Sequence, residues 1–150
     1  MAIMNLNDLL DLTINELLCD GNTPKFTFLQ NQNINMFEVI IRGLGGLVSA
    51  YHFILNSEHR ECIKTIAIEL GENIYLTTFD NTNKDNSAQI SDLPWIIINI
   101  FDKTVVRDDV TSLAPAGLAS NIIEFAALSH ITNDSKYYIA AKNTDFSFFI

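Results

Sequence analysis

Apolar residues recur at helical intervals in some segments of this chain and alternate as in strands in others, and this switching constrains the fold most. Six apolar residues between positions 6 and 18 fall on one side of a helix with about 3.6 residues per turn. Asn5 is a suitable N-cap, and Gly21 is a suitable stop. The pattern therefore predicts an amphipathic helix over residues 6–18.

The next two segments are strongly apolar. Residues 25–30 alternate and predict a short strand. Asn35 and Glu38 have the spacing of a capping pair, so we expect a helix over residues 36–44 that ends at a cluster of glycines. For residues 47–55 the glycines and the Val, Tyr, Phe and Ile content favour a strand, and a continued helix is the alternative.

A hairpin is predicted in the centre of the chain. Residues 63–70 and 73–79 flank the pair Gly71-Glu72, which suits a two-residue type II′ turn. This register places Leu70 opposite Asn73. Both segments have apolar residues on both faces, so we expect these strands inside a sheet.

The second half contains one long polar stretch, residues 80–92, which is typical of an exposed loop. Pro94 then precedes residues 95–101, whose three consecutive isoleucines favour a buried strand over a helix. A short partner strand is expected at residues 104–107.

The sequence closes with a predicted helix and a predicted hairpin. Only Glu124 is charged within residues 115–130, so this helix is expected to be buried on several sides or to meet another subunit. Residues 137–142 and 145–150 alternate as two strands. The whole pattern predicts one α+β domain over residues 1–150, with a mostly antiparallel sheet and about three helices packed on it.

The charge balance excludes several classes of protein. Nine basic and eighteen acidic residues give a formal net charge of −9, which disfavours binding to nucleic acid or to an anionic membrane surface. The hydrophobic content of 48% is too high for a disordered chain. No apolar run approaches the roughly 20 residues that span a bilayer.

Two features predict a cytoplasmic location. The first twenty residues contain four acidic and no basic residues, which is unlike a signal peptide. Cys19 and Cys62 are too few for a disulfide scaffold, so we expect both to be thiols.

The residues with reactive side chains form no complete motif. His52, His59 and Cys62 lie close in sequence, but a structural zinc site needs four ligands. A nucleophile triad from the same residues would require a geometry that sequence proximity does not establish. We therefore expect no catalytic residues, no metal and no cofactor. The alternative is a small ligand-binding or enzymatic domain that uses these three residues.

The remaining signal is the acidic surface, which either keeps the protein soluble or complements a basic partner. The second interpretation predicts a bacterial immunity protein that occludes the active site of a basic toxin, such as a nuclease. A secretion-type chaperone that binds an effector has the same size and charge, and a homodimer is left open. The candidate partner-binding residues are Asp80, Asp85, Asp92, Asp102, Asp108 and Asp109.

Overall fold

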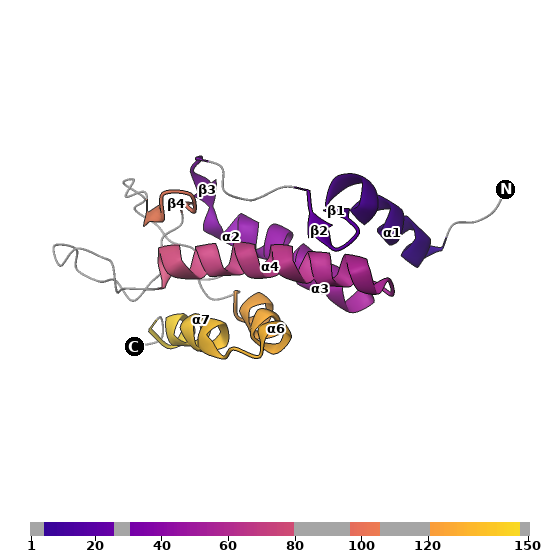
Figure 1. Cartoon of the computed structure of the whole chain (residues 1–150). Helices are drawn as coiled ribbons and strands as arrows, with labels where there is room; N and C mark the ends of the chain where they lie inside the picture. Colours follow the sequence, from indigo (N-terminus) through magenta and orange to yellow (C-terminus); the bar gives the residue numbers. More distant parts are fainter. Residues whose placement is uncertain (1–4, 26–30, 80–96, 106–120, 148–150) are drawn as a thin grey trace.

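The computed structural model describes residues 5–25, 31–79, 97–105 and 121–147, and within these residues the chain is mostly helical (Figure 1). The helices are α1 (Leu6–Leu17), α2 (Met36–Glu38), the π-helix η1 (Val39–Leu44), α3 (Gly45–Phe53), α4 (Ser57–Thr78), α6 (Ile122–Thr132) and α7 (Lys136–Ser147). The strands are β1 (Cys19–Asp20), β2 (Thr23–Pro24), β3 (Ile34–Asn35), β4 (Ile97–Asn99) and β5 (Thr104–Val105).

Helix α1 confirms the first prediction. Asn5 caps it, because its Oδ1 accepts a hydrogen bond from the Asp8 backbone N–H at 3.0 Å. Ile14 is the buried residue of the helix, which packs against α4. The antiparallel β1–β2 pair follows, and Gly21 turns it with a φ of 58°, a conformation that favours glycine.

The second predicted helix is longer than expected. Asn35 does cap it, since its Oδ1 accepts from the Glu38 N–H at 3.1 Å. The glycines do not end it: the chain continues through η1 into α3, so the strand favoured for residues 47–55 is wrong. Close packing explains why glycine is tolerated, because a Cβ at Gly43 would lie only 3.3 Å from Leu70 Cδ2 of α4.

The central hairpin is also wrong, because residues 57–78 form the single helix α4. Its residues at helical spacing are fully buried, among them Ile63, Ile66, Leu70 and Ile74. A buried helix and a buried strand both show apolar residues on several sides, so the pattern could not separate them. Gly71 is no turn residue here. It lies directly against Leu128 of α6.

The sheet is small. Strands β3, β4 and β5 pair antiparallel, with Ile98 opposite both Ile34 and Val105. The predicted strands at 95–101 and 104–107 are confirmed over 97–99 and 104–105, the residues that the structure describes as strand. The strand expected at 25–30, apart from Lys25, and the loop expected at 80–92 lie outside the described residues.

The end of the chain is helical. Helix α6 confirms the helix predicted for 115–130 over its described residues, 122–130. The predicted C-terminal hairpin is wrong, since residues 136–147 form α7. A short turn joins α6 to α7 and lets the two helices pack on each other as an αα-hairpin.

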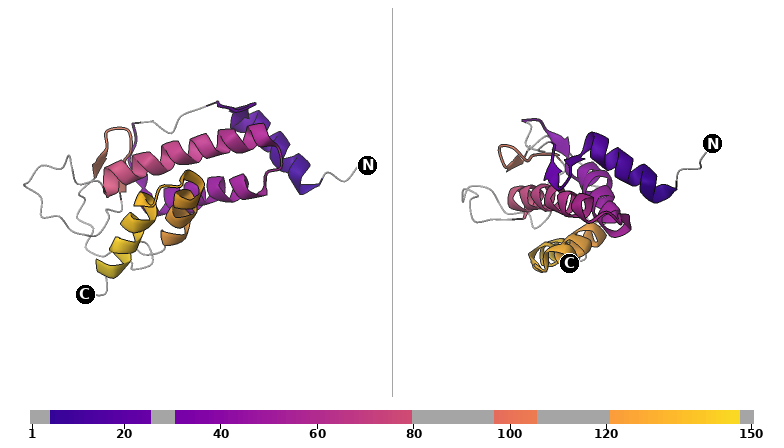
Figure 2. Two further views of the ribbon diagram at one scale, coloured as in Figure 1. Left: turned by 60° about the horizontal axis from the view of Figure 1, so that its bottom comes forward. Right: turned by 45° about the vertical axis from the view of Figure 1, so that its right-hand side comes forward.

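The α+β prediction is therefore wrong, and the molecule consists mainly of stacked helical hairpins. Helix α3 packs along α4, α6 packs along α7, and α4 contacts α6. Figures 1 and 2 show α4 as the long central element, with α6 and α7 on one side and α1 near one end. The core lies mainly between these helices. The β3–β4–β5 sheet lies at the other end of α4, whereas the β1–β2 pair lies beside α1.

Candidate functional site

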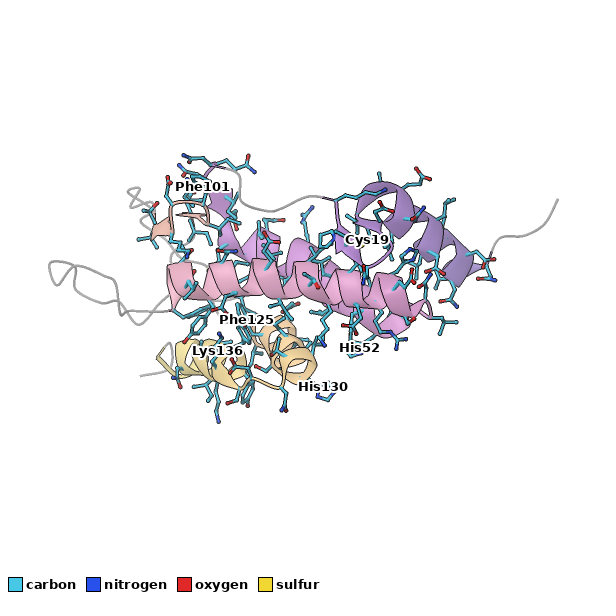
Figure 3. The ribbon with its side chains drawn as sticks, in the orientation of Figure 1. Cys19, His52, Phe101, Phe125, His130 and Lys136 are labelled. Atoms are coloured by element: carbon cyan, nitrogen blue, oxygen red, sulfur yellow. A yellow bond between two sulfur atoms is a disulfide. The ribbon has the colours of Figure 1, made fainter. Side chains whose placement is uncertain are left out.

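Cys19 and Cys62 form a disulfide, which contradicts the expectation of two thiols. The bond joins β1 to α4, and Figure 3 labels Cys19 at this junction. Both residues are fully buried. Their helix and strand placement brings together positions 43 residues apart, a proximity that the sequence alone does not reveal.

The three residues of the alternative enzymatic hypothesis do not converge. Cys62 is in the disulfide, and His59 is buried with its Nδ1 3.0 Å from Asp11 Oδ1 of α1. His52 is exposed on α3 and contacts the Tyr51 ring edge-on. Among the described residues, no group of three or more His, Cys, Asp or Glu side chains could hold a metal ion. His59 therefore contacts α1, and Cys62 attaches β1 to α4.

Of the six acidic candidates, the structure describes one. Asp102 is exposed in the turn between β4 and β5, and its backbone N–H donates to Asn99 Oδ1 at 3.2 Å. The other five, Asp80, Asp85, Asp92, Asp108 and Asp109, lie outside the described residues. The structure therefore does not test whether these six residues form an acidic interface.

A carboxylate that the sequence analysis did not select has an unusual environment. Glu124 lies in the first turn of α6, and a Cβ built at Gly45 would be 3.4 Å from its Cγ and 3.5 Å from its Oε1. Its Oε2 is buried and has no hydrogen-bond partner among the described residues. A buried carboxylate oxygen without a partner is costly, so this oxygen requires an explanation.

A second carboxylate lies in the same continuous run of helices, seven residues before Gly45. Glu38 immediately precedes η1, forms an ion pair with Arg42, and keeps 46% of its side chain exposed. In η1 the backbone N–H of Gly45 bonds to Ile40 O, five residues back. Such π-helical turns are rare and are frequently found at functional sites.

Together these residues form what we call the η1–α6 site: Glu38, Arg42, Gly45 and Glu124. Seven residues separate Glu38 from Gly45, about 10 Å along a helix axis, so both carboxylates border one short stretch of helix. A pair of carboxylates can supply a general acid and a general base, and can accept hydrogen bonds from a polar ligand. The sequence contained one usable signal, because Glu124 is the one Asp, Glu, Lys or Arg residue in a mostly apolar helix.

A third carboxylate, that of Glu72, binds two side chains of α7. Glu72 Oε2 accepts from Tyr137 OH at 2.6 Å and pairs with Lys136 Nζ at 2.7 Å. Burial, followed by this hydrogen bond, raises the pKa of Tyr137 well above its usual value. The hydrogen bond to Glu72 raises the pKa of Lys136. Figure 3 places Lys136 at the start of α7, facing α4. This cluster clamps α7 to α4 and is not free to bind a ligand.

Comparison with known proteins gives the context of the η1–α6 site. Residues 1–146 match the model of glycosyl hydrolase family 47. The chain belongs to glycosyl hydrolase family 47.

Individual relatives agree with the family assignment. The chain is 29% identical over 126 residues to the α-mannosidase I MNS5 of Arabidopsis thaliana, covering 79% of the chain and 20% of that protein. It is 29% identical over 109 residues to the endoplasmic reticulum mannosyl-oligosaccharide 1,2-α-mannosidase of Saccharomyces cerevisiae, covering 70% of the chain and 18% of that protein. The chain thus spans about a fifth of the curated relatives it matches.

A solved structure shares the fold. The α-1,2-mannosidase from Trichoderma reesei superposes with a TM-score of 0.62 at 24% identity, over 93% of this chain and 27% of that one. This structural match is a second reason why the α+β prediction is wrong.

These findings overturn several expectations. The family assignment contradicts the prediction of an immunity protein, of a secretion chaperone and of a non-enzymatic binding protein. The relatives of this chain are named as mannosidases, whereas the prediction was a protein that binds a basic toxin. These relatives are eukaryotic, not bacterial.

The predicted cytoplasmic location is also wrong. The yeast relative is named for the endoplasmic reticulum, and the Cys19–Cys62 disulfide is of a kind that persists in oxidising compartments. The described residues contain no helix that is both long enough and apolar enough to cross a bilayer.

Proposed function

We propose that this chain supplies glycan-contacting residues of an α-1,2-mannosidase, and that Glu38 and Glu124 are the carboxylates that face the sugar. Support for the substrate class comes from the family and from the names of the relatives, which act on α-1,2-linked mannose. Support for the position comes from the η1–α6 site.

The observation that carries the proposal is the buried Glu124 Oε2 without a hydrogen-bond partner among the described residues. Sugar hydroxyl groups are donors, and a carboxylate oxygen is a strong acceptor for them. Because Gly45 has no side chain, the Glu124 side chain can lie close to the start of α3. Glu38, exposed and held by Arg42, is placed where a substrate can reach it.

Binding is tested with the disaccharide α-1,2-mannobiose and the isotope-labelled chain. We expect saturable changes in the amide NMR signals of residues 38–45 and 122–126, with maltose as the control sugar. Glu124→Gln keeps the shape of the side chain but removes its charge, and it should weaken binding about tenfold, since hydrogen bonds to charged groups contribute roughly 1.5–3 kcal/mol. Glu38→Gln should weaken it as well.

Glu61→Gln is the matched control, because Glu61 is an exposed glutamate of α4 whose carboxylate lies 3.8 Å from Lys64 Nζ. It should leave binding unchanged. Signal changes confined to other regions, or equal binding by wild type and Glu124→Gln, would refute the assignment of the site. Hydrolysis of mannobiose by the polypeptide that contains this chain, abolished by Glu38→Gln, tests the catalytic part.

A further inference from the structure

The turn between α6 and α7 contains a modification motif that glycan hydrolysis does not use. Asn133, Asp134 and Ser135 follow the pattern Asn-x-Ser with a middle residue other than proline, which is the acceptor sequence for N-linked glycosylation. No other Asn in the 150 residues has Ser or Thr two positions later. The chain therefore offers one acceptor.

The structure presents this acceptor to solvent. Asn133 and Ser135 are both exposed at the end of α6. The backbone N–H of Asn133 bonds to Ser129 O, while its side-chain amide makes no hydrogen bond to any described residue. A sugar attached to the amide nitrogen would thus displace no contact of the folded protein.

The compartment is suited to this modification. N-linked glycosylation occurs on surface loops of secreted proteins, where disulfides also form. The buried Cys19–Cys62 disulfide and the endoplasmic reticulum relative both point to such a compartment. We infer that Asn133 is a site of N-linked glycosylation.

The acceptor is also compatible with the η1–α6 site. Glu124 lies in the first turn of α6, and Asn133 follows the last. Nine residues of helix separate them by about 13 Å along the axis. A glycan on Asn133 would leave from the end of α6 opposite to Glu124 and would not cover that site.

Asn133 also ends helix α6, and this structural role must be distinguished from a role as a glycosylation site. Its φ of 56° is left-handed, and asparagine is the residue after glycine that most often ends a helix this way. Two substitutions distinguish the structural role of Asn133 from its role as an acceptor. Asn133→Gly keeps the helix end and removes the acceptor, whereas Ser135→Ala removes the acceptor but leaves Asn133 in place.

The decisive measurement is peptide mass spectrometry on the chain purified from its own cells. We expect a glycan on the peptide that contains Asn133, released by peptide N-glycosidase with conversion of Asn133 to Asp. In a eukaryotic secretory host, Ser135→Thr should keep the glycan, and Asn133→Gly and Ser135→Ala should both lose it. Retention of the glycan in Ser135→Ala would overturn the assignment to Asn133.

An unmodified Asn133 in molecules whose Cys19–Cys62 disulfide is formed would overturn the inference itself. The result is independent of the mannobiose experiments, because neither outcome depends on Glu38 or Glu124.

Discussion

Cys19 and Cys62 are the residues whose replacement should affect stability most. Their bond closes a loop across 43 positions, and the chain-entropy model gives about 4 kcal/mol for a loop of this size. We expect the double variant Cys19→Ser, Cys62→Ser to lose most of this free energy of unfolding, measured by urea denaturation. Wild type under reducing conditions is the control and should behave alike. A loss below about 1 kcal/mol would mean that the unfolded loop is already compact.

The Glu72 cluster predicts a dependence of stability on alkaline pH. In the folded chain the pKa values of Tyr137 and Lys136 both lie above their ordinary values of about 10 and 10.4. Above about pH 10 the unfolded chain releases these protons while the folded chain keeps them, so stability falls as pH rises. Glu72→Gln removes the shared acceptor charge.

This variant should be less stable than wild type at pH 8, and its loss of stability between pH 10 and 11 should be shallower. Thermal unfolding by circular dichroism at each pH measures both quantities. Glu61→Gln is again the control, with an unchanged slope. An identical alkaline slope in Glu72→Gln would show that the cluster does not set the two pKa values.

At the scale of elements, two helical glycines should respond to alanine in opposite directions. A methyl group at Gly71 would collide with Leu128, which is fully buried and cannot move into solvent. Overpacking of a core costs about 1–3 kcal/mol, more than the roughly 1 kcal/mol that alanine adds to a helix. Gly71→Ala should therefore destabilise the chain.

Gly46 is the matched control, since a Cβ there has no atom of the described residues within 4 Å, apart from its own helix backbone and chain neighbours. Gly46→Ala should stabilise the protein by about 0.5–1 kcal/mol. Both changes are measured by chemical denaturation. If Gly71→Ala were also stabilising, α4 and α6 would have to be less tightly packed than the structure shows.

The elements differ in how far the sequence could define them. Helix α1 was predictable because one face is polar and Asn5 gives a cap. Helix α4 was not, because apolar residues on several sides and the pair Gly71-Glu72 suit a hairpin equally well. The reason for Gly71 is a contact with Leu128, 57 positions away, which no local pattern contains.

The candidate site was harder still to predict. Glu38 was visible only as half of a capping pair. The structure confirms that its backbone N–H bonds to Asn35 Oδ1 and adds an ion pair with Arg42. Glu124 stood out as a lone charge in an apolar helix, yet its meaning depends on Gly45 in a distant segment. The disulfide likewise depends on the approach of β1 to α4.

At the scale of the whole molecule, the exposed apolar surface predicts association. Helix α6 is apolar on nearly every side, yet Ile123 is 73% exposed, and Ile139 of α7 is exposed as well. A helix that is hydrophobic all round is normally buried. We expect concentration-dependent self-association in sedimentation experiments, reduced by the combined change Ile123→Ser, Ile139→Ser.

Leu6→Ser on α1 provides a control on a different exposed side chain. It should reduce association less, because it removes one exposed apolar side chain instead of two and leaves Leu9, Leu12 and Leu17 of α1 exposed. A chain that stays monomeric at all concentrations would show that the exposed isoleucines are too scattered to form a contact surface.

The disulfide also determines how the molecule responds to a mechanical load. A pulling force applied at the two ends travels through the sulfur atoms and bypasses residues 20–61, which contain η1 and α3. The oxidised chain should therefore reach a contour length roughly 150 Å shorter than the reduced chain, at about 3.5 Å per residue. Even a fully stretched oxidised molecule would leave Glu38 and Arg42 in an unloaded loop.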